Sequence, residues 1–395
     1  MNNKASTNHR GFFWKKDSIP RTIFDSMRKI AIIDHVGAKA GLDYYSSSLA
    51  MGIVSYGVNV ILISNFSIKQ AGIKCFSYFG LHQNNVLKKA FNFYNGFLFA
   101  GIRSRYEGAN EAIIHLFSFG YKDLIAVIIL KLLGLKLHAI VHDVEGFEES
   151  DKPWIQKIIL GSLIQKLSVH NQFSKNVLGT KVSKKILEKT KILKHGHFHA
   201  LPFPHPNREE ARNLLGFDDE KTYFLFFGQI KQVKGLDLLI ESFAAANLEN
   251  AVLVVAGKPW KADYEMYAEM IRQKNIQSKI LGFIRFIEDD ERDLFFKACD
   301  VLVLPYRKIY QSGVLLMATS YRIPVIVSNL SPNLDIIEDG KSGLVFESGD
   351  SDSLKEKIIW ASQNKDEIQE FADDAWASLA KSHDWKKIAR GYLVE

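Results

Sequence analysis

The sequence predicts an α/β protein made of sheets of parallel strands with helices on their faces. Apolar runs with the length of strands buried on both sides lie at 29–36, 58–64, 301–304 and 324–327. The runs of each pair are separated by a polar or glycine-containing loop and by a segment with helical spacing, such as 37–57. Because one such unit lies in each half of the 395 residues, we expect two separate sheets.

The composition is that of an ordinary globular protein, with 47% hydrophobic and 24% charged residues. Cys75 and Cys299 are far apart in apolar surroundings, so we expect two buried thiols in a reducing compartment and no disulfide framework. The most apolar stretch, 124–141, contains two lysines and a glycine, which favours a helix followed by a strand over a transmembrane span. Residues 1–24 lack the apolar core of a signal peptide and are interpreted as a basic arm.

Charge is divided unevenly along the chain. The net charge is +14 for residues 1–205 and −7 for residues 206–395. A basic N-terminal half favours an anionic membrane surface or an acidic, lipid-linked acceptor as partner, and solubility alone is the competing explanation. No arginine-rich helix, zinc spacing or base-stacking motif is present, so nucleic acid is not an expected partner.

The loop between the two C-terminal apolar runs has the features of an anion site. It contains Gln311, Ser312, Gly313 and Val314, where Ser312 is suited to cap the following helix and Gly313 allows a ligand to approach the backbone. The free N–H groups and the dipole of a helix start favour a phosphate there. An ordinary helix cap without a ligand explains the same pattern.

A second glycine-containing loop, 228–235, lies between an expected strand and the helix 236–243. It starts at Gly228 and carries Lys231 and Lys234 on either side of the turn into the helix. Two lysines at a helix start make a suitable cradle for an anion, although a plain surface loop would look similar.

Several stretches, in this order, resemble the donor-binding domain of GT-B glycosyltransferases of the family 4 type: FFGQIKQVKGLDLLIESF (226–243), LVVAGKPW (253–260), the block 300–329 and the turn EDGKSG (338–343). This resemblance implies the GT-B fold, in which two Rossmann-like domains face each other across a central cleft. The implied parts are the arm 1–24, an acceptor-side domain 25–203, a nucleotide-sugar domain 204–375 and a helix 376–395 that crosses back to the N-terminal domain.

The resemblance also implies which residues bind the donor: Gly41, Gly228, Gln229, Lys231, Lys234, Phe283, Ile284, Gln311, Ser312, Gly313, Val314 and Asp335. Two positions depart from the family pattern. Gln229 stands where an arginine is usual, and Lys231 could replace its charge. Met317 stands where the second glutamate of an acidic pair usually binds the ribose; the first usually lies eight residues earlier, at the sugar-facing end of the loop. Either this variant, with QSGV at 311–314, holds the donor through Gln311, Ser312 and backbone, or nucleotide binding is impaired.

His142 ends an expected strand at the carboxyl edge of the N-terminal sheet, where open α/β sheets bind their ligands. In similar enzymes the histidine at this strand end contacts the transferred sugar, so we expect His142 and Lys234 to be catalytic. A structural histidine held by a backbone partner is the alternative interpretation.

Four histidines, at 195, 197, 199 and 205, lie close together in the sequence. The spacing of the first three is typical of a strand, and no cysteine or carboxylate cluster accompanies them, so we expect a linker stiffened by prolines and no zinc site. GT-B transferases generally need no metal, and we expect neither a metal nor any other cofactor.

Residues 84–106 are rich in aromatic and basic side chains. A buried helix pair is one interpretation. The other is a surface that enters a lipid headgroup layer, with Lys88, Lys89, Arg103 and Arg105 near anionic lipid.

The resemblance to GT-B transferases, together with the charge asymmetry, implies a metal-independent hexosyltransferase that retains the anomeric configuration. Its donor would be a nucleotide-diphosphate sugar, and its acceptor a glycan of surface polysaccharide or exopolysaccharide synthesis, which is expected to be lipid-linked. The protein would be cytoplasmic, at the inner face of the cytoplasmic membrane. The alternative is a non-catalytic GT-B partner protein in a polysaccharide-assembly complex.

Overall fold

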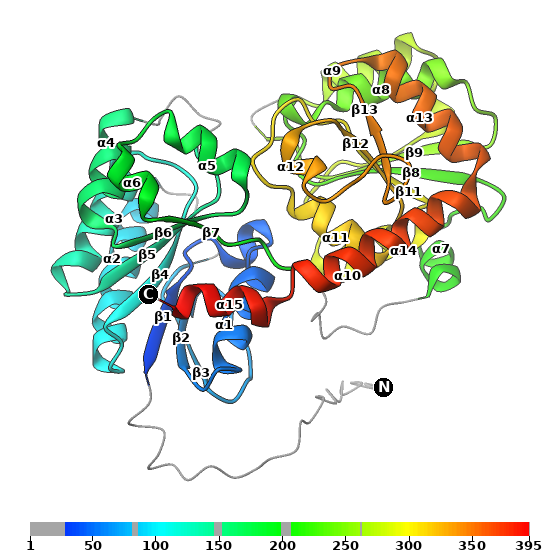
Figure 1. Ribbon diagram of the computed structural model, residues 1–395. Helices are drawn as coiled ribbons and strands as arrows, with labels where there is room; N and C mark the ends of the chain where they lie inside the picture. The colour runs from blue at the N-terminus through cyan, green and yellow to red at the C-terminus, as the bar shows by residue number, and fades with distance from the viewer. Residues whose placement is uncertain (1–27, 81–85, 146–151, 199–206, 261–262, 395) are drawn as a thin grey trace, which may run out of the picture.

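The computed structural model describes residues 28–80, 86–145, 152–198, 207–260 and 263–394, and contains two parallel sheets (Figure 1). The N-terminal sheet has seven strands in the order β3-β2-β1-β4-β5-β6-β7. They are β1 (Lys29–Ile33), β2 (Asn59–Ser64), β3 (Ile73–Ser77), β4 (Glu111–Leu116), β5 (Lys136–Val141), β6 (Lys166–Val169) and β7 (Thr190–Ile192). All neighbouring pairs are parallel, so the carboxyl ends of the strands share one edge.

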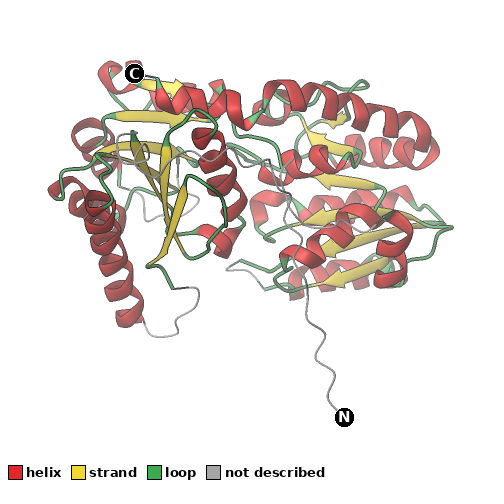
Figure 2. Cartoon of the chain, turned by 90° about the horizontal axis from the view of Figure 1, so that it is seen from below, coloured by secondary structure: helices red, strands yellow, loops and turns green. Residues whose placement is uncertain are grey.

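Helices cover both faces of this sheet (Figure 2). They are η2 (Gly37–Ala40), α1 (Asp43–Val54), α2 (Val86–Tyr106), α3 (Tyr121–Leu132), α4 (Pro153–Ile158), the π-helix η3 (Ile159–Leu163), α5 (Gln172–Gly179) and α6 (Lys184–Glu188). Successive side chains of β1 point to opposite faces of the sheet and pack into two separate cores. Ile30 and Ile32 pack with Leu49 of α1, whereas Ala31 and Ile33 pack with residues of α2 and α3.

The C-terminal sheet has six parallel strands in the order β10-β9-β8-β11-β12-β13. They are β8 (Thr222–Phe227), β9 (Ala251–Ala256), β10 (Ile280–Phe283), β11 (Val301–Leu304), β12 (Val325–Ser328) and β13 (Leu344–Phe346). The helices of this domain are α7 (Arg208–Leu215), η4 (Gln232–Lys234), α8 (Leu236–Ala246), α9 (Glu265–Gln273), η5 (Gln277–Lys279), α10 (Asp289–Ala298), α11 (Gly313–Tyr321), α12 (Ser331–Leu334) and α13 (Ser351–Gln363). The two α/β sheets predicted from the sequence are thus confirmed.

The last two helices connect the domains. α14 (Lys365–Ser382) packs on α11, and α15 (Trp385–Leu393) packs along α1 of the N-terminal domain (Figure 1). Trp385 is buried, and its indole N–H donates to the His197 carbonyl at 2.7 Å. A Cβ on Gly196 would lie 2.2 Å from the Trp385 ring, so only glycine fits at that position.

Some sequence expectations need correction. Residues 86–106 form one helix with an exposed apolar face, and not a buried pair, because only one side of the helix packs on α3 and β1. Cys75 is only half-buried, whereas Cys299 is buried as expected. Although the HxHxH spacing is typical of a strand, His195 and His197 lie in the segment that follows β7, which ends at Ile192. His199 and His205 lie outside the described residues.

The stretch 124–141 is a helix followed by a strand, as predicted, since it contains most of α3 and all of β5. Within the described part of the chain, none of the helices combines the length and the hydrophobicity that crossing a bilayer requires.

The packing of Trp385 predicts a large stability effect. We expect Trp385→Ala to lower the free energy of unfolding by about 3–5 kcal/mol, because it leaves a cavity between α15 and α1. Trp154→Ala is the matched control, since Trp154 is 48% exposed and its loss should change stability by less than about 0.5 kcal/mol. Urea denaturation of both variants measures the difference, and equal effects would contradict this packing role.

Candidate functional site

The loop after β8 brings several predicted donor-binding residues to the carboxyl edge of the C-terminal sheet. Gly228 follows the strand with φ of 106°, and a Cβ there would lie 3.6 Å from Val314 at the start of α11. Gln229 is exposed, so its side chain is not held in place by packing. Lys231 lies with its Nζ 5.0 Å from the centre of the Trp260 ring.

Lys234, the second lysine of this loop, is half-buried. Its Nζ lies 3.7 Å from the centre of the Tyr306 ring. Burial lowers the pKa of Lys234 to about 8, and the nearby charge of Asp143, from the N-terminal domain, opposes this shift. The next residue, Gly235, lies so close to Pro305 that a Cβ would be 1.9 Å from the Pro305 carbonyl oxygen. An anion bound here would favour the charged form of Lys234.

The start of α11 is built as predicted. Ser312 is the N-cap: its hydroxyl accepts a hydrogen bond from the Leu315 amide at 3.1 Å. The side chain of Ser312 is buried, whereas Gly313 and Val314 are half-buried. A Cβ on Gly313 would lie 3.9 Å from the Tyr44 hydroxyl, so the helix start faces the N-terminal domain.

The loop between β11 and α11 is bound to the N-terminal domain. Tyr310 is buried in the core of that domain, and its hydroxyl donates to Glu145 at 2.5 Å. Glu145 also pairs with Lys308 and Lys181, both at 2.7 Å. These three donors lower the pKa of Glu145 to about 2, with Lys181 contributing most.

Asn171 binds the same loop from its other side. Its amide donates to the Tyr310 carbonyl at 2.6 Å and to the Gln311 side-chain oxygen at 3.2 Å. Its own side-chain oxygen caps α5 by accepting from the Ser174 amide. Gln311 is therefore oriented by the N-terminal domain.

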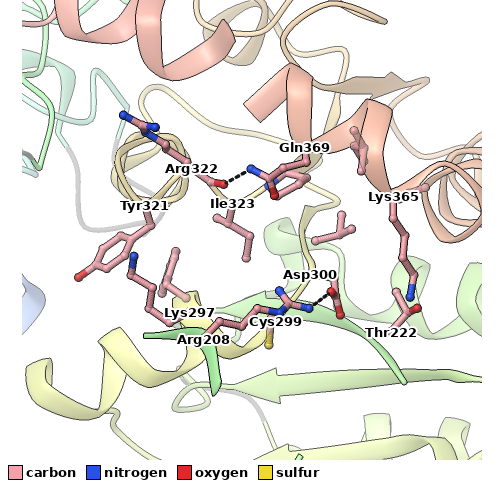
Figure 3. A pocket seen from close by; sticks show the side chains of 15 residues that line it. Arg208, Thr222, Lys297, Cys299, Asp300, Tyr321, Arg322, Ile323, Lys365 and Gln369 are labelled. Carbon is pink, nitrogen blue, oxygen red and sulfur yellow. Dashed lines mark hydrogen bonds and ion pairs between the residues drawn. The ribbon is translucent and has the colours of Figure 1, made fainter. Parts of the chain in front are cut away.

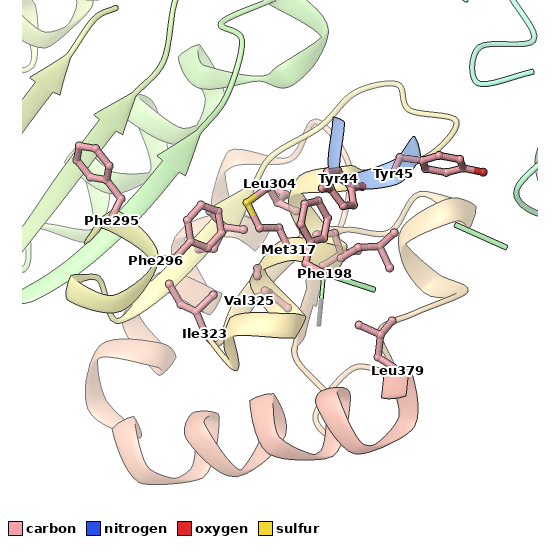
Figure 4. Packing of buried hydrophobic residues seen from close by; sticks show 14 of the residues in the cluster. Tyr44, Tyr45, Phe198, Phe295, Phe296, Leu304, Met317, Ile323, Val325 and Leu379 are labelled. Carbon is pink, nitrogen blue, oxygen red and sulfur yellow. The ribbon is translucent and has the colours of Figure 1, made fainter. Parts of the chain in front are cut away.

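Met317 lies in a hydrophobic cluster and not on a polar surface. It is 8% exposed and belongs to the same core as Leu304 and Phe296 (Figure 4). Ile309, eight residues earlier, where the family pattern has its other acidic residue, is 7% exposed. Both positions of the usual acidic pair are thus apolar and packed.

The remaining predicted donor-binding residues are less closely grouped. Phe283 ends β10, and its carbonyl accepts from the Gly257 amide at 3.0 Å, while Ile284 packs partly into the core. Asp335 is largely exposed at the end of α12, where partial burial raises its pKa and the charge of Lys194 opposes this shift. Gly41 has φ of 67°, and a Cβ on it would meet nothing within 4 Å.

His142 follows β5 and is hydrogen-bonded through both ring nitrogens. Nε2 lies 2.8 Å from His115 Nδ1, and Nδ1 lies 3.3 Å from His170 Nε2. Phe117 stacks on the ring with 4.5 Å between centres. A hydrogen bond from His142 to a sugar would require one of these contacts to break.

Burial lowers the pKa of several histidines in this domain. It lowers those of His142 and His115, and it lowers that of His170 to about 4. His195, whose pKa burial also lowers, lies 2.6 Å from the Tyr44 hydroxyl through Nε2. Within the described ranges, no three His, Cys, Asp or Glu side chains are arranged to hold a metal ion.

Sequence reasoning missed the polar residues that surround His142. Asp34, His115 and His170 each lie at the end of a strand, but Asp34 and His115 belong to apolar runs that indicate only strands. Gly37 was also missed: a Cβ on it would lie 2.2 Å from Asn65, so this glycine, more than Gly41, is required by the first loop.

A hollow of about 170 Å³ lies elsewhere on the C-terminal domain, with Arg208, Lys297, Asp300 and Lys365 among its lining residues (Figure 3). It adjoins Thr222 and Val301, the first residues of β8 and β11. It therefore lies at the amino ends of the strands, opposite the edge where α/β sheets bind ligands. We do not assign the donor to it.

Comparison with known proteins bears on the C-terminal half. Residues 207–377 match the family described as glycosyl transferases group 1. The matched residues cover the C-terminal sheet and its helices. An uncharacterized glycosyltransferase of Methanocaldococcus jannaschii is 25% identical over 182 residues, which are 45% of this chain and 45% of the relative.

The GDP-mannose:glycolipid 4-beta-D-mannosyltransferase of Xanthomonas campestris is 27% identical over 122 residues, 31% of this chain and 34% of that protein. The chain spans about half the length of the curated relatives it matches.

Solved structures match over nearly the whole chain. Sucrose-phosphate synthase of Thermosynechococcus elongatus superposes with a TM-score of 0.72 at 16% identity, covering 93% of this chain and 98% of its own. The Anabaena protein HepE in complex with UDP-glucose superposes with a TM-score of 0.69 at 14% identity, covering 92% and 98%. At these identities the likeness concerns the fold, and the predicted GT-B fold is confirmed.

The lowered pKa values predict how stability depends on pH. Below about pH 6.5 the histidines of the unfolded chain bind protons that the buried histidines of the folded chain do not, so the free energy of unfolding should fall as pH falls. Burial lowers the pKa of His138 to about 3, and its replacement by glutamine should reduce the pH dependence. Urea denaturation from about pH 8 to about pH 5 measures this, and a flat profile would contradict it.

Proposed function

We propose that this protein is a glycosyltransferase that moves a hexose-type sugar from a nucleotide-diphosphate sugar to a glycan acceptor, without a metal ion and with retention of configuration. The observation that carries the proposal is the position of Lys234. It is a half-buried lysine at the carboxyl edge of the C-terminal sheet, next to the loop that leads to α11. The geometry suits a diphosphate, whose charge would compensate the cost of burying the lysine.

In the proposed reaction the bond between the anomeric carbon and the diphosphate oxygen breaks as the acceptor hydroxyl oxygen bonds to that carbon, and the acceptor hydroxyl gives its proton to the departing diphosphate. The electron pair and the growing negative charge go to the diphosphate. Lys234, Lys231 and the start of α11 at Gly313 would stabilise that charge. The loop held by Glu145 and Asn171 would keep the two domains together while this happens.

A second function is favoured by one observation. Met317 and Ile309 are packed apolar residues, so the donor has no acidic pair to bind its ribose and sugar. A GT-B protein that has lost turnover and acts as a partner in polysaccharide assembly fits this feature. It predicts weak donor binding and no transfer.

The acceptor in our proposal is lipid-linked, and the protein works at the cytoplasmic face of a membrane. One face of α2 supports this, because it exposes residues at helical spacing: Phe91, Leu98, Phe99, Ile102 and Tyr106. α2 lies on the side of the N-terminal domain that faces away from the C-terminal domain (Figure 1). Exposed aromatic residues on a basic domain suit the interface of an anionic membrane.

Replacing Lys234 tests the transferase proposal. We expect Lys234→Ala to weaken binding of the preferred donor about 10- to 100-fold, the equivalent of one charged hydrogen bond. Lys274→Ala, at the exposed end of α9, should bind like the wild type. Calorimetry with UDP-, GDP- and dTDP-sugars measures both variants, and a turnover assay with the same donors separates the transferase from the non-catalytic partner. No binding of any donor by the wild type would refute the proposal.

The α2 face makes a separate prediction. Phe91→Ser together with Phe99→Ser should reduce binding to vesicles that contain anionic lipid by about tenfold or more, because two aromatic side chains no longer enter the headgroup layer. Flotation with vesicles of phosphatidylglycerol and phosphatidylcholine measures it. Leu214→Ser, an exposed position on α7 of the other domain, is the control. Unchanged binding of the double variant would rule this face out.

A further inference from the structure

A line of hydrogen bonds, which we call the histidine chain, runs along the carboxyl edge of the N-terminal sheet. Its members are Asp34, Ser46, His115, His142 and His170, and it ends on the Leu193 carbonyl. The successive donor–acceptor distances are 2.7, 3.2, 2.8, 3.3 and 3.0 Å. The chain arises because neighbouring parallel strands place their last residues side by side.

The far end fixes the direction of these hydrogen bonds. The Leu193 carbonyl can only accept, so His170 donates to it from Nδ1. A neutral His170 then accepts at Nε2 from His142 Nδ1, and a neutral His142 accepts at Nε2 from His115 Nδ1. Each neutral imidazole carries one hydrogen, so in this state His115 Nε2 carries none.

The near end then lacks one hydrogen. Ser46 has a single hydroxyl hydrogen, but it lies between two acceptors, the Asp34 carboxylate at 2.7 Å and His115 Nε2 at 3.2 Å. The other oxygen of Asp34 is occupied, since it accepts from the Val36 and Gly37 amides. Five contacts therefore share four hydrogens when the histidines are neutral and Asp34 is ionised.

We propose that the histidine chain is a binding site for one proton, which His115 takes up before His142 or His170. With a hydrogen on Nε2, His115 donates to Ser46 and Ser46 donates to Asp34, so every contact has one hydrogen. A second proton would place two hydrogens in one contact and break it. The chain as a whole therefore binds one proton although it contains three imidazoles.

The surroundings place that proton at His115. Burial lowers the pKa of His115, and the charge of Asp34, which is bound to the same Ser46 hydroxyl, opposes this shift and favours the cationic form. The other titratable groups facing His115 are Tyr45, His142, His170 and His195, all without negative charge at neutral pH. His142 meanwhile keeps its hydrogen on Nδ1 with both nitrogens engaged, which fixes its orientation.

Replacement of Asp34 by asparagine tests the proposal without any substrate. The side-chain oxygen of the new amide can still accept from the backbone amides, and its NH₂ group supplies the missing hydrogen to Ser46, so neutral histidines complete the chain. In ¹⁵N-histidine NMR from about pH 8 to about pH 4, we expect His115 of the wild type to take up one additional proton. In Asp34→Asn we expect the histidine chain to take up none. His115→Asn, His142→Asn and His170→Asn variants assign the signals.

Three results would each overturn the proposal. They are proton uptake first at His142 or His170, uptake of more than one proton by the histidine chain in the folded protein, and titration of Asp34→Asn like the wild type. Ser46→Ala provides a second variant in case Asp34→Asn does not fold, and it should abolish the preference for His115. Ser47→Ala is its matched control, since the Ser47 hydroxyl donates to the Asp43 carbonyl outside the chain, and it should titrate like the wild type. Because the readout needs no nucleotide, failure of the proposed transferase activity would leave this result unaffected.

Discussion

Insertion of Tyr310 into the N-terminal domain is the interaction on which the arrangement of the candidate site depends. The residue belongs to the loop before α11, yet its ring completes the other domain's core and its hydroxyl and carbonyl bond to Glu145 and Asn171. Because this loop also positions Gln311 and the helix start, the candidate donor site is assembled jointly by both domains. Neither domain alone would hold these groups in place.

Burial explains most of the electrostatics on both sides of this contact. On the C-terminal side burial lowers the pKa of Lys234, so an anionic ligand would stabilise its charged form. On the N-terminal side it keeps several histidines neutral, and neutral imidazoles can bond to one another only in a directed order. Burial at the strand ends therefore suits the C-terminal side, with Lys234, to an anionic ligand. It suits the N-terminal side, with its neutral histidines, to an ordered hydrogen-bond chain.

Sequence alone predicted the elements well, because buried parallel strands are short apolar runs and Ser312 has the chemistry of an N-cap. It also placed Gly228 and Val314, which lie side by side, in one site. It could not find the histidine chain, since that depends on which strands are neighbours, and the chain order β2-β1-β4-β5 is not visible in the residues. The exposed face of α2 was ambiguous for a related reason: apolar residues on nearly every side do not reveal which side has a packing partner.

The return of α15 to the N-terminal domain has a consequence for synthesis on the ribosome. The first domain to be made cannot complete its packing until residues 385–393 have been translated, because α1 is covered by that helix. Folding in the order of synthesis is the usual route for chains with several domains. Here the nascent N-terminal half must wait, with the surface of α1 uncovered, for the rest of the chain to emerge.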